Sequence, residues 1–411
     1  PNGAYGEYAY YDNRDLNTFT YKKSDQTPIM ALSYTYDNAH NIVAQIKDGV
    51  TREFGYDNLY QLTGVKKNSV VAESFSYDPV GNRLTSKDKP LWAYNANNQL
   101  TAYTGANLGY DNNGNTTSKV EGTATETYGY DFENRLMSYS NGTTSASYKY
   151  DPMGRRIEKT VGGTITRFLW DGNVMIAELN TSNAITKLYT YNPQTNEPIA
   201  MTEGTNTYFY LTDHLMIPQK MINSAETVVW SAEYKAFGEV TIDPASTVTN
   251  NLRFPGQYAD GEATGLYYNF HRSYQYLHGR YLQKDPAGLA TLRLEASLVR
   301  RKHKISFQNQ NLPFVPNSFQ PSEQASANYL GELIILVPQE LHEYLYVGNN
   351  PLINADEKGE KIFDRCTMAR TIECLPDESC PSCTRAFEKV LICPCIRVPG
   401  TNYVIPYTPC N

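Results

Sequence analysis

The chain has 411 residues, a formal net charge of -7 and 19% charged residues. This acidic balance gives no electrostatic reason to expect nucleic acid or an anionic membrane as the main partner. No run of about 18 apolar residues occurs, so no transmembrane segment is expected. Tyrosine is abundant, with 34 copies against 14 phenylalanines and 3 tryptophans. Because tyrosine has an apolar ring and a polar tip, this composition suits β-sheets with one wet face and one partly covered face.

An aromatic residue followed by aspartate recurs through the first half of the chain. Between Tyr110 and Tyr191 the step is about 20 residues, a period that indicates a stack of small structural units. The copies are Tyr11-Asp12, Tyr36-Asp37, Tyr56-Asp57, Tyr77-Asp78, Tyr110-Asp111, Tyr130-Asp131, Tyr150-Asp151 and Trp170-Asp171, with Tyr94-Asn95 and Tyr191-Asn192 as weaker copies.

A turn follows each copy. Asp78-Pro79-Val80-Gly81 and Asp151-Pro152-Met153-Gly154 place Asp first, Pro second and Gly fourth, which are the preferences of a type I turn. We therefore expect the aspartate to begin a turn and the tyrosine to end a strand.

The rest of each unit is predicted to be a hairpin. Gly162-Gly163 separates residues 155–161 from residues 164–170, two runs rich in β-branched and aromatic residues, and Asn141-Gly142 does the same in the preceding unit. The pattern predicts an all-β fold of antiparallel β-hairpin repeats over residues 1–240. Such an array buries its apolar faces between neighbouring units, so no single central core is expected.

A longer block of sequence follows the repeats. Its motifs are Leu252-Arg253-Phe254-Pro255-Gly256-Gln257-Tyr258, Thr264-Gly265-Leu266-Tyr267-Tyr268-Asn269, Gly279-Arg280-Tyr281-Leu282, Asp285-Pro286-Ala287-Gly288-Leu289 and Tyr344-Leu345-Tyr346-Val347-Gly348-Asn349-Asn350-Pro351. These motifs resemble the RHS-associated core of the YD-repeat or RHS (rearrangement hotspot) proteins, and the resemblance covers residues 1–289 and 343–361.

The resemblance implies part of a hollow β-shell that spirals around cargo and is closed by the core. In the family that cargo is usually a variable C-terminal toxin or effector released by self-cleavage. The implied organisation is YD/RHS repeats at 1–240, the first part of the core at 241–289, an insertion at 290–342, the end of the core at 343–361 and a small Cys-rich segment at 362–411.

The resemblance also implies how the cargo would be released. Two aspartates, carried over as Asp285 and Asp356, would act as an aspartyl-protease pair that cuts the chain after Glu360, with Lys284 as the basic residue before the first aspartate. Two carboxylates held close together cannot both ionise, so one keeps a proton and serves as an acid while its partner activates water.

This sequence departs from the family pattern at the second aspartate. Residues 356–360 lack the proline and the leucine of the first copy, and the Gly-Gly-x-Asn block expected after Leu289 is missing. Two alternatives stay open. Either the shell still brings the two aspartates together and cleavage survives, or both are turn residues, because turn geometry alone explains Asp in an Asp-Pro-x-Gly sequence.

The insertion at 290–342 stands where the family has a short link. Residues 309–326 are rich in Gln, Asn, Pro and Ser and are predicted to be a loop or disordered. The basic run at 300–304 is most simply a solvated face on an acidic chain. Residues 331–337 are a candidate for a buried strand.

All seven cysteines lie beyond the core, in the last 50 or so residues. Cys380, Cys383, Cys393 and Cys395 have a spacing suited to a zinc site. Disulfides are the alternative, since a segment this small cannot build a sufficient core in an exported protein without staples. No cofactor is predicted elsewhere.

Three histidines are candidates for chemistry. His214 follows Asp213, but no nucleophile of fixed spacing accompanies it, and the resemblance makes it a residue that lines or packs the shell. His271 and His278 lie among tyrosines without a second ligand in register, so neither indicates a metal site.

Three functions remain open. The first is a shell with its own C-terminal segment as cargo, secreted or at the cell surface, with an immunity protein as a further partner. The second is a structural or adhesive surface protein whose tyrosines stack on a cell-surface glycan. The third is a degenerate core with an inert tail.

The chain opens at Pro1-Asn2-Gly3, inside a repeat, so we expect it to be the C-terminal part of a longer protein.

Overall fold

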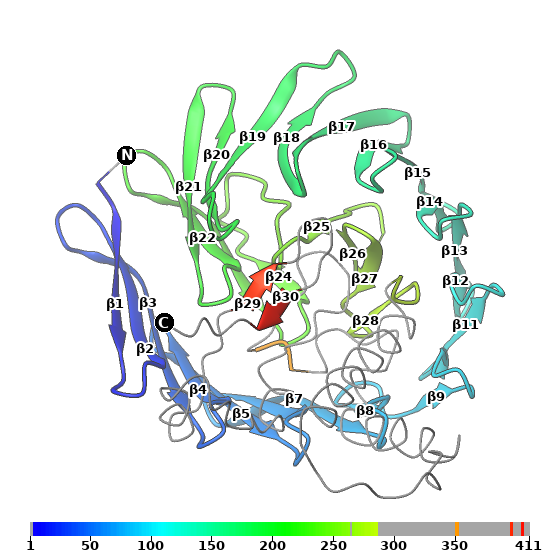
Figure 1. Cartoon of the computed structure of the whole chain (residues 1–411), viewed down its shortest axis with the longest axis horizontal. Helices are drawn as coiled ribbons and strands as arrows, with labels where there is room; N and C mark the ends of the chain where they lie inside the picture. The colour runs from blue at the N-terminus through cyan, green and yellow to red at the C-terminus, as the bar shows by residue number, and fades with distance from the viewer. Residues whose placement is uncertain (1–2, 264, 287–349, 353–394, 398–403, 407–411) are drawn as a thin grey trace, which may run out of the picture. The chain divides into compact units, whose positions relative to one another are not determined.

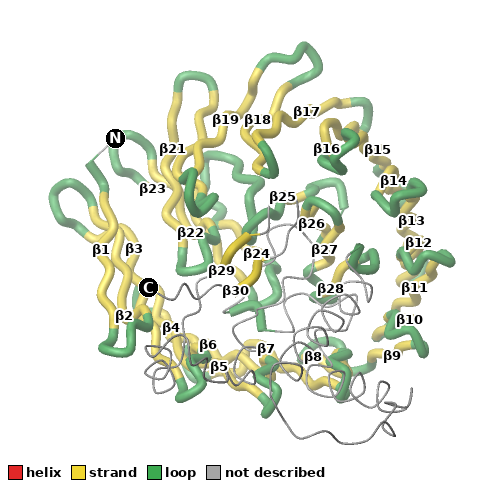
Figure 2. Tube along the Cα trace, viewed as in Figure 1, coloured by secondary structure: helices red, strands yellow, loops and turns green. Residues whose placement is uncertain are grey.

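The computed structural model describes residues 3–263, 265–286, 350–352, 395–397 and 404–406. In these residues every regular element is a strand, as Figure 2 shows, so the predicted all-β fold is confirmed. None of the described elements is a helix long and apolar enough to cross a membrane. The chain divides into two compact units, Pro1–Lys361 and Ile362–Asn411. In the second unit, β29 (Cys395–Arg397) pairs with β30 (Val404–Pro406).

The repeats form two antiparallel sheets whose strands follow one another in chain order (Figure 1). This order is that of successive hairpins, as the repeat pattern predicts. The 8-stranded sheet consists of β1 (Tyr5–Tyr10), β2 (Leu16–Lys22), β3 (Pro28–Tyr36), β4 (Ile42–Lys47), β5 (Val50–Tyr56), β6 (Leu62–Lys67), β7 (Val70–Tyr77) and β8 (Arg83–Ser86).

A 16-stranded sheet follows and ends in the first strand of the core. It consists of β9 (Trp92–Tyr94), β10 (Leu100–Tyr103), β11 (Ala106–Tyr110), β12 (Thr116–Glu121), β13 (Ala124–Tyr130), β14 (Leu136–Ser140), β15 (Ser145–Tyr150), β16 (Arg156–Val161), β17 (Thr164–Asp171), β18 (Val174–Leu179), β19 (Ile185–Tyr191), β20 (Pro198–Glu203), β21 (Asn206–Thr212), β22 (Pro218–Ile222), β23 (Val228–Tyr234) and β24 (Val240–Ile242). The core adds a 4-stranded sheet of β25 (Tyr258–Ala259), β26 (Leu266–Asn269), β27 (Arg272–Gln275) and β28 (Arg280–Tyr281).

Two-residue hairpin loops are predicted at Gly162-Gly163 and at Asn141-Gly142, and the structure has the first of them. Val161 pairs with Thr164 across Gly162-Gly163, which is the two-residue connection expected. The connection at Asn141-Gly142 is longer, because the backbone N–H of Asn141 donates to the Thr144 carbonyl at 3.1 Å and β15 does not begin until Ser145. The prediction of a two-residue loop there is wrong.

In six of the aromatic–aspartate pairs, which we call marks, the aspartate holds its turn together. At Trp170-Asp171 the aspartate is instead the last residue of β17. In the turn after β7, the backbone N–H of Gly81 donates to the Asp78 carbonyl at 3.0 Å, as the Asp-Pro-x-Gly sequence predicts. The Asp78 carboxylate accepts the backbone N–H groups of Val80 at 3.0 Å and Asn82 at 2.8 Å. An aspartate whose side chain caps its own turn competes well with alternative backbone conformations. The same pair of contacts recurs at Asp37, Asp57, Asp111, Asp131, Asp151 and Asp213.

The aromatic residue of eight marks closes the hairpin of its own unit by donating to the start of the hairpin's first strand. The β4–β5 ladder begins at Ala44, so the Ile42 carbonyl lies beyond it, and the Tyr56 hydroxyl donates to that carbonyl at 2.7 Å. The Tyr130 hydroxyl donates to the Thr116 carbonyl in the same way at 2.8 Å. The hydroxyl therefore satisfies a carbonyl that the ladder leaves without an amide. The same bond is made by Tyr36, Tyr77, Tyr94, Tyr110 and Tyr150, and by the indole N–H of Trp170.

We expect Tyr130→Phe to lower the free energy of unfolding by about 1 kcal/mol, because it leaves the Thr116 carbonyl without its donor while keeping the ring. Burial also raises the pKa of Tyr130 well above its ordinary 10.0. Tyr10→Phe is the matched control, since the Tyr10 side chain is 61% exposed and should change the free energy little. Urea unfolding measures both. Equal effects of the two substitutions would contradict the role given to the buried hydroxyl.

The buried apolar side chains of the described residues form four separate clusters and not one central core. The clusters nevertheless extend beyond neighbouring units. One of them joins strands β17–β23 to the core residues that follow them, among which Phe254, Tyr258, Tyr267 and Tyr274 are at most 5% exposed. Large apolar residues alternate along one face of β3, at Met30, Leu32 and Tyr34, and residues far along the chain help to cover that face.

A buried ion pair fastens the core segment to the wall. The guanidinium of Arg156, from β16, donates to both Asp260 oxygens at 2.7 Å, and the two side chains are 2% and 1% exposed. Burial disfavours the charged guanidinium, but Asp260 raises the pKa of Arg156 above its ordinary value. Beside it Glu262 accepts from Lys159 at 2.8 Å and from the Tyr148 hydroxyl at 2.9 Å.

Arg156→Met should destabilise the protein by about 3–5 kcal/mol, because the Asp260 carboxylate is then buried without its partner. The double variant Arg156→Met, Asp260→Leu should recover part of that loss, since it buries no charge. Urea unfolding of the two variants makes the comparison. A double variant no more stable than the single one would mean that the loss comes from packing and not from the uncompensated charge.

Candidate functional site

Asp285 lies at the end of the core segment, just after the β27–β28 hairpin. Its side chain is buried, and the Arg272 guanidinium lies 3.1 Å from its carboxylate. Arg272 is itself buried and stacks its guanidinium on the Tyr281 ring, 3.6 Å from the centroid. The ion pair compensates the charge of a carboxylate that would otherwise be costly to bury.

The backbone before Asp285 is fixed on both sides. The Leu282 backbone donates to the Ser273 carbonyl at 2.9 Å, and the Gln283 side chain accepts the Ser273 backbone N–H at 2.8 Å. The Leu282 carbonyl accepts from both the backbone N–H and the hydroxyl of Thr116, at 2.9 and 3.1 Å. Since Thr116 belongs to β12 of the wall, the wall sets the position from which Asp285 is presented.

The remaining predicted site residues divide into two groups. Lys284 is described and is half-buried next to Asp285. Asp356, Glu360, Cys380, Cys383 and Cys393 lie outside the described residues, and of Cys395 the structure gives the backbone of β29 alone. The insertion at 290–342 also lies outside them. The proximity of the two aspartates and the choice between zinc and disulfides therefore stay predictions.

The three histidines have clear surroundings. His278 is buried against the rings of Tyr103 and Trp92, at 4.6 and 6.1 Å, and burial lowers its pKa well below 6.5. His271 packs on Phe270 at 4.4 Å. Among residues 3–263, 265–286 and 350–352, no cluster of His, Cys, Asp and Glu is arranged to hold a metal ion.

His214 does more than pack. Its Nδ1 lies 3.1 Å from the Tyr34 hydroxyl, and its Nε2 lies 2.7 Å from the carbonyl of Leu352. Leu352 lies in the segment predicted to end the core, and Asn350, two positions before it, is buried against the turns of the 8-stranded sheet. This contact is not predictable from the sequence, because the residues are 138 positions apart.

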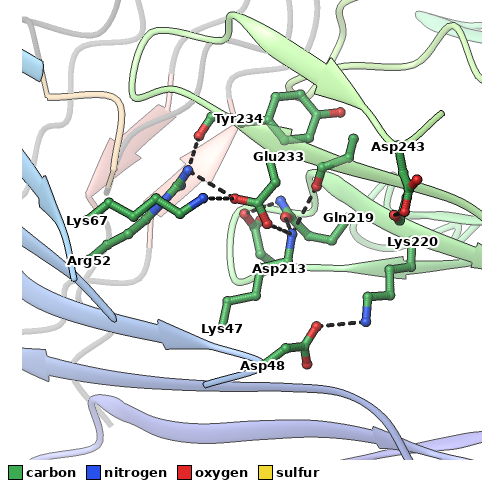
Figure 3. A network of polar contacts seen from close by, with 12 residues as sticks. Lys47, Asp48, Arg52, Lys67, Asp213, Gln219, Lys220, Glu233, Tyr234 and Asp243 are labelled. Atoms are coloured by element: carbon green, nitrogen blue, oxygen red, sulfur yellow. Dashed lines mark hydrogen bonds and ion pairs between the residues drawn. The ribbon is translucent and has the colours of Figure 1, made fainter. Parts of the chain in front are cut away.

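A polar seam joins strands from the start of the array to strands from its end (Figure 3). Glu233 of β23 lies between Lys47 at 3.6 Å, Arg52 at 3.5 Å and Lys67 at 3.5 Å, from β4, β5 and β6. The Lys47 ammonium also donates to the Gln219 side chain at 2.6 Å. The Glu233 carboxylate thus contacts basic side chains from three consecutive strands, β4, β5 and β6.

Two further groups complete the seam. Lys220 of β22 pairs with Asp48 at 2.7 Å. The buried Asp213 carboxylate accepts the Gln219 amide at 3.0 Å, and burial raises the pKa of Asp213 above its ordinary 3.8. Burial likewise lowers the pKa of Lys47 below 10.5, although Glu233 opposes the shift.

The seam predicts a pH dependence of stability. Burial opposes ionisation of Glu233, but Lys47, Arg52 and Lys67 outweigh it and hold its pKa below the ordinary 4.5. A carboxylate with a lowered folded-state pKa stabilises the protein above pH 4.5, and this contribution is lost as the pH falls through the folded-state pKa.

Wild type should therefore lose more stability than Glu233→Gln as the pH is lowered from 7 towards 3. Thermal unfolding across this range tests the difference. Glu203→Gln is a control on a strand away from the seam, and it should follow wild type. If Glu233→Gln instead kept the wild-type pH profile, the three basic residues would not be stabilising the Glu233 carboxylate.

Comparison with known sequences gives one family and several relatives. The chain matches the Teneurin YD-shell family over residues 5–313. It is 29% identical over 296 residues to double-stranded DNA deaminase toxin A of Burkholderia cenocepacia, which covers 62% of this chain and 20% of that protein. It is 30% identical over 270 residues to the tRNA3(Ser)-specific nuclease WapA of Bacillus spizizenii, covering 62% and 10%. The chain thus spans a fifth or less of the length of these relatives.

Solved structures share the fold. The Tc holotoxin pore of Photorhabdus luminescens, carrying a mutation in TccC3, matches with a TM-score of 0.62 at 16% identity over 92% of this chain and 18% of that chain. A crystal structure of TcdB2-TccC3 matches with a TM-score of 0.52 at 16% identity over 87% of this chain and 19% of that chain. With its aspartate-capped turns, its tyrosine bonds across each hairpin and a family match over more than half its length, the chain belongs to the Teneurin YD-shell family.

Proposed function

We propose that this chain is a section of a shell wall whose core holds and presents the C-terminal segment, residues 362–411, as cargo. The observation that carries the proposal is the buried Asp285, ion-paired to Arg272 at 3.1 Å at the end of a core segment that Arg156 and Asp260 lock onto the wall. A segment held in this way fixes the position at which the chain that follows it begins. The similarity to a deaminase toxin and a nuclease supports an effector as the cargo of an exported or cell-surface toxin.

The use of tyrosine favours a shell over an adhesive surface. Adhesion through stacking needs exposed rings, but the tyrosines of the marks donate inside the wall, and those of β26–β28 are buried. Tyr8 and Tyr10 of β1 are the more exposed ones, at 52% and 61%. Glycan binding that disappeared on their replacement would support the adhesive alternative. An effector released from the shell would in turn call for an immunity protein as a partner.

Cleavage after Glu360 by Asp285 and Asp356 is the release step of this proposal. Asp285, whose carboxylate lies 3.1 Å from the Arg272 guanidinium, takes a proton from water while Asp356 donates its proton to the Glu360 carbonyl oxygen. The oxygen of the water bonds to the carbonyl carbon. Collapse of this intermediate breaks the bond to the Lys361 nitrogen, which takes up the proton that Asp285 held, while one hydroxyl of the intermediate returns its proton to Asp356. The products are a chain that ends in the α-carboxylate of Glu360 and a chain that begins with the α-amine of Lys361. Lys284 lies beside the proposed site.

Intact mass of the purified chain tests the release step. Wild type should lose residues 361–411 on incubation, whereas Asp285→Asn and Asp356→Asn should stay whole. Asp260→Asn is the matched control, because it also breaks a buried aspartate–arginine pair of the core segment but lies outside the proposed site. It should still be cut in the fraction that remains folded. A wild-type chain that stays intact, or an Asp285→Asn chain cut at the wild-type rate, would overturn the cleavage while leaving the shell.

A further inference from the structure

The first aspartate-bearing segment of the core docks between two turns of the wall. The Arg280 guanidinium, five positions before Asp285, donates to the Asn82 side-chain oxygen at 3.3 Å and to the Asn98 carbonyl at 2.7 Å. Asn82 is the fourth residue after the aspartate of its turn, and Asn98 is the third residue after the asparagine that begins the next turn. The guanidinium therefore bridges two consecutive turns.

The second segment docks on an equivalent pair of acceptors. The Asn350 amide, six positions before Asp356, lies 3.0 Å from the Tyr60 carbonyl and 3.4 Å from the Asn41 side-chain oxygen. Asn41 is again the fourth residue after a turn aspartate, and Tyr60 is the third residue after the aspartate that begins the next turn. Tyr60 has a φ of 61°, close to the 57° of Asn98, so both carbonyls leave the turn with the same backbone geometry.

A carbonyl near each aspartate is anchored as well. Thr116 donates to the Leu282 carbonyl at 2.9 Å, three positions before Asp285. His214 lies 2.7 Å from the Leu352 carbonyl, four positions before Asp356. Because a carbonyl accepts but never donates, the Nε2 of His214 carries the hydrogen of this bond.

We infer that the edge of the array formed by its turns carries a docking site for the second core segment, built from Asn41, the Tyr60 carbonyl and His214, and that this site positions Asp356 for cleavage. The purpose of the site rests on the proposed cleavage; the docking itself does not. His214 is a positioning residue here, since it touches the Leu352 backbone and not the bond to be cut.

The spacing of the two docking sites is compatible with an aspartate pair. The sites are two units apart, which is four strands at about 4.8 Å, or about 19 Å along the wall. Four residues of extended chain after the anchored Leu352 span about 13 Å, and the three from the anchored Leu282 to Asp285 span at most about 10 Å, so together they can bridge this distance. The docking thus removes most of the freedom that the insertion at 290–342 would otherwise give the second aspartate.

Hydrogen exchange tests the docking without relying on cleavage. The variants Asn350→Asp and His214→Ala are made in an Asp285→Asn chain, which is expected to stay whole. In Asn350→Asp a carboxylate oxygen replaces the amide donor. It faces the Asn41 side-chain oxygen and the Tyr60 carbonyl, so neither hydrogen bond forms. We expect exchange in peptides covering residues 343–352 to become about tenfold faster in both, the loss of one or two hydrogen bonds. His214→Gln, which keeps a donor near Nε2, should restore slow exchange.

Asn115→Ala is the matched control, because Asn115 is the corresponding turn residue of another unit and binds Asn134 in place of the core. It should leave exchange at residues 343–352 unchanged. The same substitutions in the wild-type background should slow cleavage about tenfold, which intact mass follows over time. Exchange unchanged by Asn350→Asp and His214→Ala would overturn the docking site. Faster exchange in a chain whose wild type is never cut would keep the docking and overturn the proposed cleavage.

Discussion

The hydroxyl of most mark tyrosines donates to a backbone carbonyl at the start of the other strand of the same hairpin, and the rest of the fold depends on this bond. The ladder of the hairpin stops short of that carbonyl, as at Ile42, where β4 pairs with β5 from Ala44 onward. Tyr56 fills the gap at 2.7 Å, and the aspartate that follows the tyrosine caps the next turn. One two-residue mark therefore ends a strand, closes a hairpin and begins the turn that leads into the next unit. Because consecutive hairpins also pair with each other, as β3 does with β4, each unit is stabilised by its neighbour.

Stacking the marks places every capped turn on the same edge of the array, and this edge then serves the core. Its turns present side-chain oxygens and carbonyls at regular spacing, which Arg280 and Asn350 use in corresponding ways. The face of the wall receives the core through the buried pair of Arg156 and Asp260. The mark thus does no chemistry, but it builds the surface on which Asp285 is held.

The elements formed by contacts close in sequence were predictable, and the contacts between distant residues were not. Hydrophobic alternation, the turn residues and the 20-residue step predicted the hairpins and their order, because each of these signals is local. The seam around Glu233 unites residues about 180 positions apart, and nothing in a lysine or glutamate on a strand reveals its partner. His214 was assigned to lining or packing, yet it binds the Leu352 carbonyl. The contacts between distant units and the core segment are not predictable for the same reason, since a repeat pattern describes neighbours and not what covers their shared face.

The proposed cleavage requires the two core segments to converge on one site. The direct measurement is an experimental structure of the full chain with Asp285→Asn, in which the proposed cleavage cannot remove the second segment. We expect Asn350 to bind the Asn41 and Tyr60 acceptors, with the Asp356 carboxyl within hydrogen-bond reach of residue 285. An Asp356 carboxyl more than about 10 Å from that position, with the second segment in place, would contradict it, because paired carboxylates must share a proton and a water.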